Sequence, residues 1–300
     1  MTRERNLRRS VVLITVLSFA PGAPSPARAS TDPAAEAGPR SLDHKEGVGL
    51  PLLAGAIASV ALPPALYNTP PACRWCDGAS PNPVDKWAAR AKWEKPCPAS
   101  RLSYVSLGAA GAVALLPMSR EPSASQWMAN AGAVADSVAV TVMLTQVVKH
   151  TVRRARPGAD ACHPGRATDP DRNLSFFSGH AAIAFALVSS AHETNRLRGR
   201  STNDWVWVGG GAAAATAYLR VAGGRHHLID VLAGAGVGYM VGRWIPRHVT
   251  RPKEPEAQVS GPEFRSPPVF AYSRAVGGDG KVHFQVGKGP GKSVQFGLRF

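Results

Sequence analysis

The chain has 300 residues, of which 44% are hydrophobic and 18% are charged, and 35 Lys and Arg stand against 20 Asp and Glu. This length and apolar content allow one large domain with a sizeable core, which argues against a chain too polar to fold, and the charged fraction is low for a soluble protein. The net charge of +15 suits a polyanion, an anionic membrane surface or phosphate-bearing substrates.

The first 29 residues have the three parts of a secretory signal peptide. A basic stretch, MTRERNLRRS, precedes an apolar one, VVLITVLSFA, and Ala-Arg-Ala at 27–29 offers a small-x-small cleavage site. An uncleaved anchor is the alternative, but the apolar stretch is short for a membrane span. We therefore expect a signal peptide over 1–29, a flexible polar segment over 30–47, and an exported protein of the periplasm or cell envelope.

Apolar, Ala- and Gly-rich stretches dominate the middle of the chain and predict closely packed helices, at about 48–66, 101–117, 127–150, 179–192, 205–222 and 228–245. The expected fold class is mainly α, a helical bundle of about six apolar helices in a domain over 48–245. Several stretches are short for a bilayer, which needs about 20 residues. If all of them crossed a membrane after signal cleavage, the third would end inside the cell. We therefore favour an exported bundle, soluble or membrane-associated, with an integral membrane protein as the alternative.

A cysteine-containing insert, residues 67–100, separates the first two helical stretches. Its cysteines are Cys73, Cys76 and Cys97, and a fourth, Cys162, lies further along the chain. An even number of cysteines in an exported protein predicts disulfides, and three pairings are open. A zinc or redox role for the Cys-x-x-Cys is the alternative, although zinc usually needs a second close pair. The stretch DKWAARAKWEK in this insert predicts a short basic helix, either on a membrane surface or as a solvated cap.

The chain changes character after residue 245. Residues 246–268 form a Pro-rich linker, and residues 269–300 contain VFAYSRA, KVHFQV and SVQFGLRF between Gly-rich stretches. Alternating apolar residues bounded by Gly predict a small β-like C-terminal tail.

One stretch, RVAGGRHHLIDVLAG at 221–235, places ionisable side chains between two apolar runs. A buried charge is costly unless it is paired, so these residues are exposed, mutually satisfied or functional. His226 and Asp230 are four residues apart, which on a helix puts them on one face, and an aspartate that fixes the imidazole tautomer makes the other nitrogen a better nucleophile. Arg220, and Arg225 with it, would supply positive charge to an anion, while His227 would point elsewhere.

Two further clusters complete a cationic set. Ser178 and Gly179 precede an apolar helix, whose N-terminal N–H groups can hold a phosphate, and His180 is placed to protonate a leaving oxygen. Lys149 and Arg156 offer donors that suit phosphate oxygens. Each cluster alone has an ordinary structural explanation, namely a core hydrogen bond, a helix cap or a solvated helix end. Their joint order predicts a metal-free phosphate pocket.

The ordered set resembles the type 2 phosphatidic acid phosphatase and vanadium haloperoxidase superfamily. That family has Lys-x6-Arg-Pro, Pro-Ser-Gly-His and Ser-Arg-x5-His-x3-Asp, and this chain has Lys149-x6-Arg156-Pro157, Phe177-Ser178-Gly179-His180 and Leu219-Arg220-x5-His226-x3-Asp230. Phe177 stands where the family has proline, and Leu219 where it has serine. The resemblance covers roughly residues 100–245 and implies hydrolysis of phosphate esters through a phosphohistidine.

The resemblance also implies the residue roles. His226 would attack phosphorus, Asp230 would orient it, and His180 would protonate the leaving group, while the phosphoryl oxygens would be held by Lys149, Arg156, Ser178, Gly179 and Arg220. The expected substrate is a phosphorylated lipid or a small phosphate or pyrophosphate, with a membrane surface as a partner, no nucleic acid, and no cofactor. Vanadate would be an inhibitor, or the cofactor if the protein is a haloperoxidase. A non-catalytic exported envelope protein is the alternative of another class.

Overall fold

The computed structural model describes residues 40–66, 71–76, 82–121, 123–158, 162, 171–200, 203–253, 281–287 and 293–299. The chain divides into two compact units, Met1–Lys253 and Glu254–Phe300. The predicted signal peptide lies outside the described residues, and so does most of the predicted Pro-rich linker.

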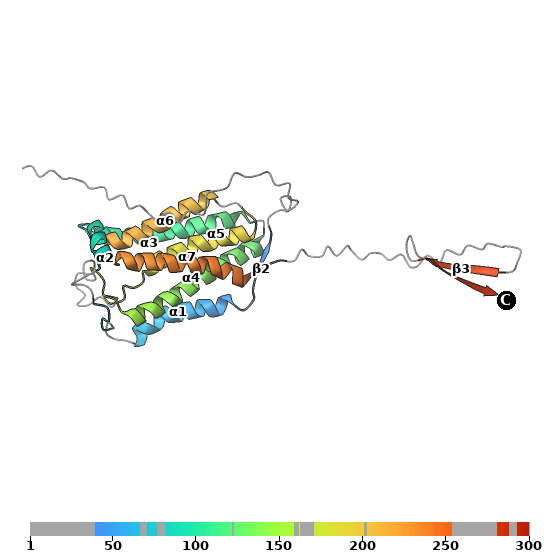
Figure 1. Ribbon diagram of the computed structural model, residues 1–300, viewed down its shortest axis with the longest axis horizontal. Helices are drawn as coiled ribbons and strands as arrows, with labels where there is room; N and C mark the ends of the chain where they lie inside the picture. Colours follow the sequence, from blue (N-terminus) through green and yellow to red (C-terminus); the bar gives the residue numbers. More distant parts are fainter. Residues whose placement is uncertain are drawn as a thin grey trace, which may run out of the picture. The chain divides into compact units, whose positions relative to one another are not determined.

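The first unit is a bundle of helices, which confirms the predicted mainly α fold (Figure 1). The long helices lie close to the predicted stretches and are α1 (Gly49–Leu66), α3 (Pro96–Leu115), α4 (Ala124–Val152), α5 (Gly179–Leu197), α6 (Asn203–Ala222) and α7 (Leu228–Val249). Helix α5 is central, because it packs on α3, α4, α6 and most extensively on α7.

Glycines on α7 explain why it lies so close to α5. A β-carbon on Gly234 would lie 2.5 Å from the carbonyl oxygen of Ser178, and one on Gly238 would lie 2.0 Å from that of Ala182. Any side chain at these two positions would therefore push the helices apart. The close approach brings the N-terminal ends of α5 and α7 together, and the Ser178 N–H donates to the Asp230 carbonyl at 2.9 Å.

The cysteine-containing insert forms short helices at the end of the bundle where α5 and α7 begin. Helix α2 (Pro83–Ala88) is capped by Asn82, whose side chain accepts the Asp85 N–H at 3.0 Å, and a 3-10 turn, η3 (Ala89–Ala91), follows. The expected helix over DKWAARAKWEK is therefore shorter than its sequence suggests. Cys97 is joined to Cys162 and Cys73 to Cys76, so the structure selects one of the three open pairings.

Two short strands at the opposite end of the bundle were not predicted, because three residues are too few to show an alternating pattern. Strand β1 (Leu42–His44) pairs antiparallel with β2 (Thr250–Pro252), which directly follows α7. His44 Nε2 also lies 2.8 Å from Oδ2 of Asp136 on α4, so the first described residues are held at this end.

The second unit contains an antiparallel pair, β3 (Lys281–Gly287) and β4 (Ser293–Arg299). The pair agrees with the β-like tail expected from KVHFQV and SVQFGLRF. The third expected strand, VFAYSRA, lies outside the described residues.

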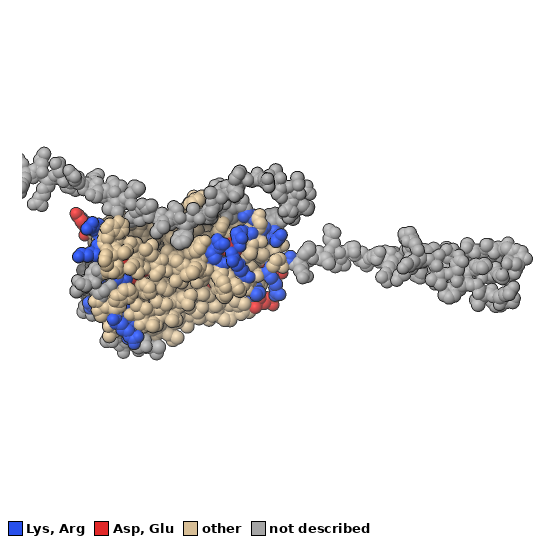
Figure 2. All heavy atoms as spheres, viewed as in Figure 1, with Lys and Arg blue, Asp and Glu red and all other residues tan. Residues whose placement is uncertain are grey.

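The sides of the bundle are apolar, whereas its ends are charged and aromatic. Figure 2 shows Lys and Arg gathered toward the two ends of the helical unit, with a broad band that lacks charged residues between them. Among the described residues, three helical segments are long and apolar enough to cross a membrane, Pro96–Ser119, Ala124–Val152 and Leu228–Val249. Exposed aromatic residues stand near both ends, Trp75, Trp87, Trp93, Tyr104 and Tyr218 at one and Trp127, Trp207 and Trp244 at the other. This distribution is typical of membrane association.

Candidate active site

The three predicted motifs meet at one end of the bundle. Lys149 lies in the last turn of α4, Ser178 is the residue before α5, and Arg220 lies in the last turn of α6. Helix α4 ends where Arg153 adopts a left-handed conformation, with φ of 50°, and the chain then runs extended beside Trp75. Because α4 and α6 end where α5 and α7 begin, residues far apart in sequence share one site.

His226 does not lie on a helix, although the four-residue spacing to Asp230 suggested one. Helix α7 begins at Leu228, and the chain turns through Gly224, whose φ is +62°. Asp230 is responsible for this late start, because its Oδ2 accepts the N–H of His227 at 3.0 Å and so caps the helix.

The tautomer of His226 follows from its hydrogen bond. Its Nδ1 lies 2.7 Å from the carbonyl oxygen of Ser175, and a carbonyl can only accept, so Nδ1 carries the proton and Nε2 carries the lone pair. The nearest carboxylate oxygen of Asp230 lies 3.9 Å from the same nitrogen. The group that directly orients His226 is therefore a backbone carbonyl that sequence reasoning did not identify.

Burial and charge keep His226 neutral. The side chain is almost fully buried, and burial is the largest cause that lowers its pKa, followed by the charges of Arg220, Arg156 and Lys149. The positive charges that act on His226 thus come from Lys149 on α4, Arg220 on α6 and Arg156 in the loop after α4. His227 faces another way, with Nε2 3.3 Å from the carbonyl oxygen of Ala155.

Asp230 belongs to a buried ionic network that the sequence did not reveal. Its Oδ1 accepts from Nη1 of Arg154 at 2.5 Å, and its Oδ2 accepts from the Ser175 hydroxyl at 2.5 Å. Nη2 of Arg154 donates to Oδ2 of Asp85 at 2.7 Å, and both side chains of that pair are fully buried. Asp230 thus acts on His226 through Ser175. The Ser175 hydroxyl donates to Asp230, and the Ser175 carbonyl accepts from His226.

Asp85 links the insert to the start of α7. Its Oδ1 accepts the N–H of Ile229 at 2.9 Å. Burial on its own raises the pKa of this carboxyl, but hydrogen bonds from Ile229, Arg154 and Asn82 outweigh burial, so the pKa lies below its usual value. Asp85 is therefore a carboxylate that helps to fix the loop of His226.

Some buried polar atoms of the predicted pocket have no hydrogen-bond partner among the described residues: Ser178 Oγ, His180 Nε2 and Arg220 Nε. Buried polar groups are nearly always satisfied in proteins, so unpartnered ones indicate a place where a polar ligand binds. Ser178 and His180 flank the N-terminus of α5, whose first N–H groups favour an anion. Arg220 is held in place by the Ser103 hydroxyl, at 3.2 Å from Nη1.

Arg156 and His180 also have contacts that fix their orientation. Nε of Arg156 donates to the carbonyl oxygen of Asp171 at 2.8 Å, and Nη2 lies 3.4 Å from the carboxylate of the same residue. The ring of Tyr104 lies edge-on to His180, with centroids 4.5 Å apart, although 61% of the Tyr104 surface is exposed. Tyr104 therefore stands at the entrance beside His180.

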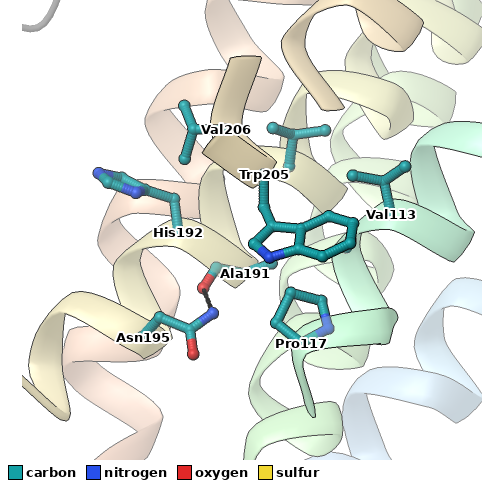
Figure 3. Close-up of a pocket in the computed structure, with 9 residues that line it drawn as sticks. Val113, Pro117, Ala191, His192, Asn195, Trp205 and Val206 are labelled. Carbon is teal, nitrogen blue, oxygen red and sulfur yellow. Dashed lines mark hydrogen bonds between the residues drawn. The ribbon is translucent and has the colours of Figure 1, made fainter. Parts of the chain in front are cut away.

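A small hollow at the opposite end of the bundle is unrelated to this site. Figure 3 shows Val113, His192, Asn195 and Trp205 around it, where α3 and α5 end and α6 begins. Its volume is about 20 Å³, which is room for about one water molecule and not for a substrate.

Residues 130–253, which include all three motifs, match the model of the PAP2 superfamily, the family of the type 2 phosphatidic acid phosphatases. A stretch of 118 residues, 37% of this chain, is 32% identical to a protein from Porphyromonas gingivalis named lipid A 1-phosphatase, of which it spans 23%. The chain thus covers less than a quarter of that relative's length. The resemblance predicted from the three motifs is confirmed by this match over residues 130–253.

Proposed function

We propose that this protein is a metal-independent phosphatase that hydrolyses phosphate monoesters or pyrophosphates of lipids through a phosphohistidine. The observation that carries the proposal is the convergence of a neutral, oriented His226 with the unpartnered buried atoms of Ser178, His180 and Arg220. An imidazole lone pair beside a cationic, donor-rich pocket suits attack on a phosphoryl group.

In the proposed mechanism, Nε2 of His226 attacks phosphorus while the bond from phosphorus to the leaving oxygen breaks. His180, protonated once the bound phosphate offsets the burial and the cations that lower its pKa to about 3, gives this proton to that oxygen, so the alcohol or phosphate leaves neutralised. The proton on Nδ1 of His226 stays hydrogen-bonded to the Ser175 carbonyl and stabilises the ring as it gains positive charge. His180 then takes a proton from a water that attacks the phosphohistidine, which releases phosphate and restores both histidines.

The remaining side chains would bind the phosphoryl group and stabilise its negative charge. Lys149, Arg156 and Arg220 would bind the phosphoryl oxygens, with the N–H groups at Ser178 and Gly179. These donors stabilise the negative charge of an in-line transfer without a metal ion. Asp230 would act as a positioning residue, because it binds the Ser175 hydroxyl and Arg154.

A lipid substrate fits the surroundings of the site. The apolar sides of the helical unit and the exposed Trp87, Trp93 and Tyr104 near the site support an entrance at the level of a membrane interface. The name of the P. gingivalis relative, a lipid A phosphatase, supports a lipid phosphate as substrate. We take the bundle to lie in the membrane with the site at one surface.

The disulfides suggest which surface that is. Cys97 is joined to Cys162 near the site, and disulfides persist in oxidising compartments, so we place the site end outside the cytoplasm. Strands β1 and β2 lie at the opposite end, so residue 40 would then face the cytoplasm. This arrangement is incompatible with cleavage after residue 29, because cleavage would leave residue 40 outside.

The test is phosphate release from a panel of lipid and soluble phosphates, with the full chain purified in detergent and a chelator present. We expect hydrolysis that vanadate inhibits, that His226→Ala abolishes, and that His227→Ala largely retains. Activity lost in chelator and restored by a divalent ion would overturn the metal-free mechanism. Halide oxidation with added vanadate, and no phosphate release, would indicate a haloperoxidase instead.

A further inference from the structure

The insert places an unexplained lysine beside the active site. Lys92 follows the 3-10 turn η3, lies outside the three PAP2 motifs, and has an exposed side chain. A β-carbon on Gly224 would lie 2.9 Å from its Cε, and one on Gly158 would lie 3.1 Å from its Nζ. The ammonium group thus rests against two backbone turns, one two residues after Arg156 and the other two residues before His226.

Three separate anchors hold Lys92 in this position. Before it, Asp85 is bound to Arg154 and to the Ile229 N–H. Next to it, the N–H of Trp93 donates to the Ala222 carbonyl at 3.0 Å, and the indole N–H donates to the Tyr218 hydroxyl at 3.1 Å. After it, Cys97 is covalently joined to Cys162. A lysine on a mobile surface loop would not need such support.

The charge of Lys92 is not neutralised within the part of the chain that the structure describes, where its ammonium has neither an ion pair nor a hydrogen bond. The site behind it is already rich in cations, since Arg220, Arg156 and Lys149 all act on His226. Another positive charge near these is unfavourable on its own, and additional anionic groups bound nearby offset this cost.

We propose that Lys92 is a specificity residue that contacts a second phosphoryl group of the substrate while the first occupies the pocket around His226. This inference rests on the proposed phosphatase function. The second group is a phosphoryl group either joined directly to the first, as in a diphosphate ester, or attached elsewhere on the same headgroup. Lys92 makes the enzyme select substrates with two phosphoryl groups over simple monoesters.

The experiment compares dodecyl phosphate, dodecyl diphosphate and a dodecyl glycoside that carries two phosphates on its sugar, with the full chain in detergent. The variant is Lys92→Gln, and the matched controls are Lys86→Gln and Lys95→Gln, two exposed lysines of the same segment. We expect Lys92→Gln to reduce the ratio of kcat/KM between a doubly phosphorylated substrate and the monoester by about tenfold, mainly through KM, as for loss of a charged hydrogen bond. Lys92→Arg should largely preserve the ratio.

The substrate whose ratio falls identifies where the second phosphoryl group lies. Three results would overturn the proposal: an equal fall in kcat/KM on all three substrates, no change in either kcat/KM ratio to the monoester, or the same change of ratio in the Lys86→Gln control. Such results, with the unmodified enzyme still active on the monoester, would leave the phosphatase function intact. If the unmodified enzyme hydrolysed none of the three, the proposed function and the role of Lys92 would both be refuted.

Discussion

Replacement of Arg154 by methionine tests the buried network behind His226. The guanidinium lies between the carboxylates of Asp85 and Asp230, and the side chains of all three residues are fully buried. Methionine keeps much of the volume but removes the positive charge, so two buried carboxylates lose their common cation.

The expected loss of stability in Arg154→Met is large. Breaking a buried ion pair by removing one partner costs roughly 3–5 kcal/mol, because the other charge is left uncompensated. For a domain of this size, about 2–4 °C in Tm corresponds to 1 kcal/mol, so Arg154→Met should lower Tm by roughly 6–20 °C. Asp85→Asn alone should also destabilise the protein, because it removes the carboxylate that pairs with Nη2 of Arg154. The amide keeps one oxygen, which can still accept the Ile229 N–H.

The two changes together should behave differently. In the Arg154→Met background, Asp85→Asn removes a buried charge that has lost its partner, so it should raise Tm instead of lowering it. Thermal unfolding of the four proteins in one detergent measures this, with Glu94→Gln, an exposed carboxylate of the same insert, as the control. Losses that simply add, or a Tm of Arg154→Met within about 2 °C of the unmodified protein, would refute the network as the support of this site.

Three further expectations follow from the structure. The pKa of His226 lies well below its usual 6.5, so lowering the pH from 7 through 6.5 should not protonate the nucleophile and should not reduce kcat/KM. A fall in kcat/KM centred near pH 6.5 would contradict a buried, neutral nucleophile. Reduction of the Cys97–Cys162 bond, whose cysteines are 65 residues apart, should cost about 4.3 kcal/mol of stability in the chain-entropy model. Reduction should also slow the hydrolysis of lipid phosphates more than that of small monoesters. Four free thiols in the unreduced protein would argue against the disulfides, and equal slowing of both substrate types would argue against their role in lipid hydrolysis. The intact mass of the membrane-bound protein should include residues 1–29, and a mature chain that starts at Ser30 would rule out a spanning bundle with its site outside.

Much of the fold could be predicted from the sequence because apolar helices leave a strong periodic pattern. The stretch 228–245 was located within a few residues of α7, and the Gly-rich composition signalled the close packing that Gly234 and Gly238 allow. Strands β1 and β2 carry too few residues to be recognised, and their pairing joins segments that are about 200 residues apart.

The site was predictable as a set of residues but not as a network. The motif spacings pointed to Lys149, His180 and His226, since each spacing is local in sequence. The support of His226 depends on Ser175 and Arg154, which only the folded chain brings to Asp230. Arg154 lies in a run of basic residues that is typical of an exposed helix end, and no local pattern distinguishes its buried position.

The central claim is that His226 forms a covalent bond to phosphorus. The most direct measurement is acid-free quenching of the enzyme with ³²P-labelled dodecyl phosphate, followed by proteolysis and mass spectrometry of the labelled peptide. The account predicts an acid-labile phosphoramidate on His226 that is absent in His226→Ala. Label on another residue, or full activity in His226→Ala, would contradict it.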